Sequence, residues 1–136
     1  MVLLVEDDEA VREVLAVALE EAGMRVARVG SRAEALRVAS RVRPDLVLLD
    51  RQLPDGDGWQ VVDELRRRAA GAADVIVIAM TAHVGLTTAE RALIAGCEAF
   101  FEKPVEPARV IARATELLAA RTPSTAVRRR IKLRDS

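Results

Sequence analysis

Residues 46–58 of the chain read LVLLDRQLPDGDG, and this stretch decides the fold. Its first four residues are an unbroken run of Leu and Val, which is typical of a strand buried on both faces of a parallel sheet. Asp50 follows the run directly, and the segment from Pro54 to Gly58 indicates a loop. The stretch therefore predicts a buried strand that delivers a carboxylate to one edge of a sheet.

Apolar runs alternate with helical patterns on both sides of this stretch. Further strands are expected at residues 2–5, 24–29, 75–80 and 99–101. Helices are expected over residues 9–22 and 59–69, after capping boxes at Ser31–Glu34 and Thr87–Glu90, and from Pro107 onward. Strict alternation predicts an α/β fold, a parallel sheet with helices on both faces.

The C-terminal residues 122–136 break this pattern. They are polar and basic, and we interpret them as a disordered tail or a linker stub after a domain of residues 1–121. Contact of this tail with nucleic acid or a membrane remains an alternative.

Composition narrows the class of protein. The 136 residues include 21 Lys and Arg against 21 Asp and Glu, which argues against a nucleic-acid-binding core domain. The single cysteine, Cys97, cannot form an internal disulfide and is expected to be buried. The apolar segment at the N-terminus is too short for a signal peptide or a membrane span. We therefore expect a cytoplasmic protein without a membrane partner.

Polar residues follow the expected strands at the points where the strands end. Glu6 and Asp7 follow the first strand, Asp50 the third, Thr81 the fourth and Lys103 the fifth. Ligands of open parallel sheets bind outside the carboxyl ends of the strands, so these side chains are expected to converge. Clustered carboxylates raise each other's pKa, and a donor set of oxygens alone favours Mg²⁺. Metal, carboxylate and ammonium together suit phosphoryl transfer to an aspartate.

Four segments carry a resemblance to a known family. Residues 5–9, 48–58, 80–82 and 101–104 resemble the receiver domain of two-component response regulators, in the family's order and spacing, across roughly residues 1–121. The resemblance implies a flavodoxin-like, doubly wound sheet of five parallel strands in the order 2-1-3-4-5. It also implies that a sensor histidine kinase or phosphotransfer protein donates the phosphoryl group. Phosphorylation would change the face of the fourth helix, fifth strand and fifth helix, which a downstream protein reads.

The resemblance also implies a role for each residue of the site. Asp50 would be the phosphoacceptor, and Thr81 and Lys103 would bind phosphoryl oxygens. Asp7 would bind Mg²⁺ directly, and Glu6 directly or through water. The backbone carbonyl of Gln52 would be a further metal ligand.

Two more expectations follow from the same resemblance, and two others concern His83 and Trp59. The Lys103–Pro104 peptide would be cis. Phe100 occupies the switch-aromatic position, which is often Tyr, and lacks the hydroxyl of that residue. His83 is interpreted as lying beside the site, where it and the side chain of Gln52 would modulate access of the hydrolytic water. Trp59 is expected to pack at the start of its helix, near the mouth of the pocket.

Several alternatives stay open. A phosphatase of the haloacid dehalogenase type would need an aspartate where Gln52 stands, so we expect no enzyme beyond self-phosphorylation and self-dephosphorylation. The chain could be a phosphorelay intermediate, a scaffold that works without phosphorylation, or the front of a longer regulator. Activation could produce a homodimer through the last helix.

Overall fold

The computed structural model describes residues 1–68, 75–82 and 96–120, and five parallel strands form its main sheet. These are β1 (Val2–Val5), β2 (Val26–Val29), β3 (Leu46–Asp50), β6 (Ile76–Thr81) and β7 (Ala99–Glu102). Their order is β2-β1-β3-β6-β7. In chain order this is 2-1-3-4-5, so the predicted flavodoxin-like topology is confirmed.

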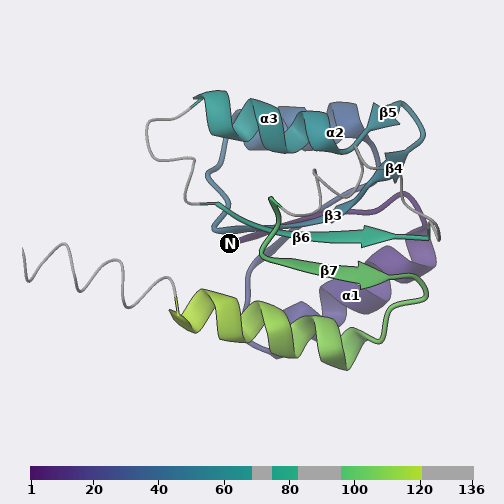
Figure 1. Ribbon diagram of the computed structural model, residues 1–136, viewed down its shortest axis with the longest axis vertical. Helices are drawn as coiled ribbons and strands as arrows, with labels where there is room; N and C mark the ends of the chain where they lie inside the picture. Colours follow the sequence, from purple (N-terminus) through teal and green to yellow (C-terminus); the bar gives the residue numbers. More distant parts are fainter. Residues whose placement is uncertain (69–74, 83–95, 121–136) are drawn as a thin grey trace, which may run out of the picture.

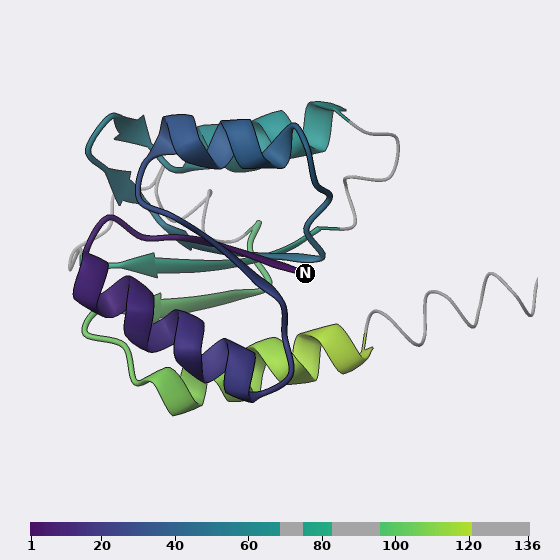
Figure 2. The ribbon, with the colours of Figure 1, turned by 180° about the vertical axis from the view of Figure 1, so that it is seen from behind.

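Helices cover both faces of the sheet. The ribbon places α2 (Arg32–Ala39) and α3 (Trp59–Arg68) on one face, and α1 (Glu9–Glu21) with the helix of residues 107–120 on the other (Figures 1 and 2). Alternate strand residues feed two apolar layers, as the pleat requires. The layer under α2 and α3 takes Leu3, Val5, Val47, Leu49, Val77 and Ala79, and the other takes Val2, Leu4, Leu46, Leu48, Ile76 and Ile78.

Local signals at the helix ends act as the sequence predicts. Ser31 is the N-cap of α2, and its side chain accepts a hydrogen bond from the backbone N–H of Glu34 at 3.2 Å. Gly23 follows the end of α1 with a φ of 92°, a conformation that glycine adopts without steric cost. The helix predicted after Thr87 and the tail of residues 122–136 fall outside the described residues.

The apolar stripe of α1 is narrower than its sequence suggests. Leu15, Ala16 and Leu19 are buried, whereas Val14 is 54% exposed and Val17 is 45% exposed. Successive helical residues are rotated by about 100°, so Val14 points well away from the centre of an arc that runs from Leu15 to Ala16. The sequence places Val14 at helical spacing with Leu15 and Leu19, but this rotation leaves it outside the buried stripe.

The loop that follows Asp50 is more ordered than predicted. Two short strands, β4 (Gln52–Leu53) and β5 (Gly56–Asp57), pair as an antiparallel hairpin. Between them Asp55 accepts hydrogen bonds from the backbone N–H groups of Arg32 at 2.8 Å and Ala33 at 2.9 Å. The carboxylate thus fastens the hairpin to the first turn of α2.

We expect Asp55→Ala to lower the melting temperature at pH 7, because two amide donors of α2 lose their acceptor. The backbone N–H groups of Ala33 and Arg32 hold the pKa of Asp55 below its usual value. A depressed folded-state pKa stabilises the fold above the unfolded pKa, and this contribution disappears as pH falls through the folded value. The difference in melting temperature should therefore shrink toward pH 3, as circular dichroism melts at several pH values would show.

Asp55→Asn should melt between Asp55→Ala and the parent, because an amide oxygen replaces only one of the two acceptors. Asp63→Ala, which changes an exposed acid on α3, is the matched control. Equal melting temperatures for Asp55→Ala and the parent at pH 7 would contradict a clamping role.

Candidate functional site

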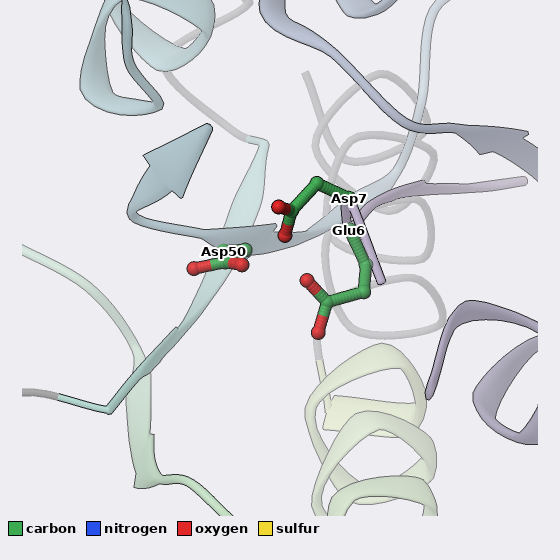
Figure 3. A group of neighbouring side chains, drawn as sticks. All are labelled: Glu6, Asp7 and Asp50. Atoms are coloured by element: carbon green, nitrogen blue, oxygen red, sulfur yellow. The ribbon is translucent and has the colours of Figure 1, made fainter. Parts of the chain in front are cut away.

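Three carboxylates meet where β1 and β3 end. Glu6 and Asp7 follow β1, Asp50 is the last residue of β3, and the two strands are neighbours in the sheet. One carboxylate oxygen from each residue lies within 4.8 Å of the others, and Figure 3 shows the three groups turned toward a common space. Glu6 is 0% exposed and Asp50 is 4% exposed, whereas Asp7 is exposed. The cluster is therefore buried on one side and opens to solvent at Asp7.

Lys103 joins the two buried acids. It follows β7, and its Nζ lies 2.6 Å from Oε1 of Glu6 and 2.8 Å from Oδ2 of Asp50. Burial alone lowers the pKa of Lys103, but the hydrogen bonds to Asp50 and Glu6 outweigh it and raise the pKa. The lysine therefore stays charged, as the predicted convergence requires.

The two buried acids differ in protonation. Burial, followed by a hydrogen bond with Asp50, raises the pKa of Glu6 to about 8. Burial also acts to raise the pKa of Asp50, but hydrogen bonds from Glu6, Lys103 and the backbone N–H of Gln52 outweigh it and lower the pKa. Mutual raising of pKa values was thus the right expectation for Glu6 and wrong for Asp50. Asp50 is therefore the more acidic of the two carboxyl groups.

The strands β6 and β7 supply the predicted hydroxyl and aromatic groups. Thr81, the last residue of β6, is 2% exposed, and its carbonyl accepts the backbone N–H of Lys103 at 2.7 Å. Phe100 pairs with Ala79 and packs, partly buried, against the apolar layer under α2 and α3. The Lys103–Pro104 peptide is cis, as the resemblance implies.

The remaining residues singled out in the sequence are Gln52, His83, Trp59 and Cys97. The side chain of Gln52 is exposed, and His83 lies outside the described residues. Trp59 is buried in the core at the start of α3, as predicted, and its backbone N–H donates to Asp57 at 3.0 Å. Cys97 is only partly buried.

Gly58 contacts the backbone of the site, which the sequence did not predict because Gly58 was interpreted there only as part of a loop. A Cβ at Gly58 would lie 2.5 Å from the carbonyl oxygen of Asp50. Its backbone N–H donates to the carbonyl of Arg51 at 2.9 Å. The hairpin therefore returns against the peptide of the buried acid. The sequence feature that could have indicated this contact is that the loop segment after Asp50 ends in a glycine, Gly58.

The donor set fits a hard divalent cation. It consists of carboxylate oxygens alone, which Mg²⁺ prefers. Oε2 of Glu6 is buried without a hydrogen-bond partner in the described part of the chain. A buried carboxylate oxygen of this kind is costly unless a proton or a cation satisfies it.

Comparisons with known proteins agree on the class of domain. The family model of the response regulator receiver domain matches residues 2–115. The KDP operon transcriptional regulatory protein KdpE of Escherichia coli is 36% identical over 98% of this chain, which spans only 58% of that protein. The polar-differentiation response regulator DivK of Brucella anthropi is 36% identical over 81% of this chain and 89% of its own length.

Solved structures show the same fold. A response regulator receiver domain protein (CheY-like) from Methanospirillum hungatei is 26% identical, with a TM-score of 0.77 over 90% of this chain and 96% of its own. The receiver domain of the sensor histidine kinase PA1611 from Pseudomonas aeruginosa is 32% identical, with a TM-score of 0.70 over 87% of this chain and 93% of its own. That structure is described with a magnesium ion coordinated in its active-site cleft. In the described part of the present chain, no helix combines the length and apolar character needed to cross a membrane.

Proposed function

This chain belongs to the response regulator receiver domain family of two-component systems, and from that premise we propose that Asp50 accepts a phosphoryl group from a phosphohistidine. A sensor histidine kinase or a phosphotransfer protein would present the donor. The observation that carries the proposal is a buried acid of lowered pKa, 2.8 Å from the ammonium of Lys103, at the end of a central strand.

The transfer balances as a direct displacement. An oxygen of the Asp50 carboxylate attacks phosphorus, and the bond between phosphorus and the histidine nitrogen breaks. The electron pair of that bond stays with the donor, which leaves as neutral imidazole when its second nitrogen carries a proton. Lys103 then pairs with an oxygen of the new phosphoryl group and offsets its charge.

Glu6, Asp7, Asp50 and the backbone carbonyl of Gln52 would hold Mg²⁺. When bound, the ion neutralises charge on the phosphoryl oxygens. The three carboxylates would orient it beside the acceptor, and the burial of Glu6 fixes one side of the site. Asp7 would contact the ion from the solvent side.

The proposed switch starts at Thr81. Its hydroxyl would bind a phosphoryl oxygen, and Phe100 would move into the space that Thr81 vacates. Thr81 lies on β6 and Phe100 on the neighbouring strand β7, so a movement of one residue would be transmitted to the other. The face that changes would comprise β7, the helix of residues 107–120 and the predicted fourth helix. A downstream protein, or a second copy of this chain, would read the face.

Reset of the switch would occur by hydrolysis at the same site. Water attacks the phosphorus, inorganic phosphate leaves, and the carboxylate of Asp50 is restored. The exposed side chain of Gln52, together with His83, would govern how easily that water enters.

Acetyl phosphate provides a direct test. In the presence of Mg²⁺ we expect intact-protein mass spectrometry to show the addition of one phosphoryl group, and peptide mapping to place it on Asp50. Removal of divalent metal with a chelator should abolish the modification, and restored Mg²⁺ should recover it. No modification with any small phosphodonor, together with unchanged binding of partners, would instead favour a scaffold that works without phosphorylation.

A further inference from the structure

Arg12 contacts the acidic turn without belonging to the carboxylate cluster. It lies in the first part of α1, and its Nη1 donates a hydrogen bond of 2.9 Å to the backbone carbonyl of Glu6. Its backbone N–H closes the first turn of the helix on the carbonyl of Asp8 at 2.8 Å. The side chain thus reaches back from the helix to the residue that ends the strand.

The contact completes the backbone bonding of Glu6. The N–H of Glu6 extends the ladder between β1 and β2 by one bond, donating to the carbonyl of Val29 at 3.1 Å. Val5 and Val29 are the last paired residues of the two strands, so no described residue of β2 is paired with Glu6 to bond its carbonyl. The guanidinium takes the place of the missing strand neighbour, so both backbone groups of this buried acid are held.

Gly30 leaves the space that the guanidinium occupies. A Cβ at this position would lie 2.8 Å from Nη1 of Arg12 and 3.7 Å from its Cζ. Gly30 does not have a positive φ, so its backbone conformation is open to alanine. What glycine provides here is room for Arg12.

We propose that Arg12 is a positioning residue for Mg²⁺ binding, which it promotes by holding the Glu6–Asp7 turn through the carbonyl of Glu6. This role rests on the proposed function, because it presumes that the acidic cluster binds Mg²⁺. Arg12 acts through Glu6 and contacts neither the ion nor the phosphoryl group. Hydrogen-bond partners behind metal ligands typically change metal affinity by about 10- to 100-fold when they are removed.

If Arg12 acts only as a nearby charge, Arg12→Met should change Mg²⁺ affinity in one direction. If it acts as a positioning residue, the change should be in the opposite direction. Loss of a nearby positive charge alone would tighten Mg²⁺ binding, because like charges repel. Loss of positioning weakens it, by about tenfold, which is about 1.4 kcal/mol. Isothermal titration with Mg²⁺ measures the sign directly. Arg25→Met, which removes an exposed arginine just before β2, is the matched control and should bind as the parent does.

Gly30→Ala tests the same contact while the charge is kept. The added methyl group displaces the guanidinium, so we expect weaker Mg²⁺ binding, and the double variant should be no worse than Arg12→Met alone. Arg12→Lys keeps a cation and a donor and should recover part of the affinity. The ¹³C chemical shift of the Glu6 carbonyl in metal-free protein should move in Arg12→Met and Gly30→Ala and stay unchanged in Arg25→Met.

Three results would overturn the role. If Arg12→Met binds Mg²⁺ as tightly as the parent, or more tightly, the guanidinium affects the site only through its charge and has no positioning role. An unmoved carbonyl shift in Arg12→Met means that the contact is absent. A parent protein that binds no Mg²⁺ overturns the proposed metal site and this role together, which separates that failure from the other two.

Discussion

Asp50→Asn is expected to abolish phosphorylation while the protein stays folded. The amide is close to the carboxylate in shape, and its oxygen can still accept the backbone N–H of Gln52, which the parent bonds at 3.1 Å. It is not a nucleophile, however, and it has no negative charge for Lys103 to pair with. Acetyl phosphate with Mg²⁺ should therefore add no mass to the variant under conditions in which the parent is modified.

The variant should also bind Mg²⁺ more weakly, because one of three clustered carboxylates is lost. Asp63→Asn makes the same chemical change at an exposed position on α3 and should match the parent in both assays. Circular dichroism checks that Asp50→Asn is folded. If a folded Asp50→Asn accepts one phosphoryl group at the parent's rate, another residue is the acceptor and the assignment is wrong.

The strand ends could be predicted from sequence because hydrophobic runs stop abruptly there. Leu49 is buried in the apolar core and the next residue is Asp50, and the same step occurs between Val5 and Glu6. The carboxyl ends of parallel strands meet at one edge, so a change of polarity along the chain becomes a cluster in space. This is why the acids and Lys103 were expected together, as they are found.

Side-chain contacts between elements could not be predicted in the same way. That Asp55 binds the first turn of α2 depends on how a hairpin lies beside a helix distant in sequence. That Arg12 reaches the carbonyl of Glu6 depends on how α1 lies relative to the end of β1. Local periodicity contains no such information. The exposure of Val14 has a related cause, because a pattern of apolar residues does not show which part of a helix face meets the sheet.

The split in pKa between Glu6 and Asp50 also needed the three-dimensional structure. Like charge alone would affect both acids in the same direction. Asp50 differs because its hydrogen bond with Glu6 lowers its own pKa and raises that of Glu6, and because it also accepts the backbone N–H of Gln52. The roles expected for His83 and for residues 122–136 stay predictions, since these residues lie outside the described part of the chain.

Lys103→Met should separate metal binding from phosphoryl transfer. The ammonium contacts both buried acids, at 2.6 Å from Glu6 and 2.8 Å from Asp50. Without it, no side-chain cation at this position offsets the charge of the incoming phosphoryl group. We expect phosphorylation by acetyl phosphate to slow by about 100-fold or more, as when a preorganised electrostatic partner is deleted. Quenched time courses read by intact mass would measure this rate.

Mg²⁺ should bind this variant at least as tightly as it binds the parent, because the ammonium and the ion compete for the same carboxylates. A collapsed site would instead lose metal binding and phosphorylation together, so isothermal titration distinguishes the two outcomes. Arg109→Met removes an exposed cation from the helix of residues 107–120 and is the matched control. Phosphorylation of Lys103→Met within about threefold of the parent rate would correspond to less than about 1 kcal/mol of barrier. The lysine would then only neutralise the charge of Glu6 and Asp50 in the unphosphorylated protein. Other groups would have to offset the charge on the phosphoryl group.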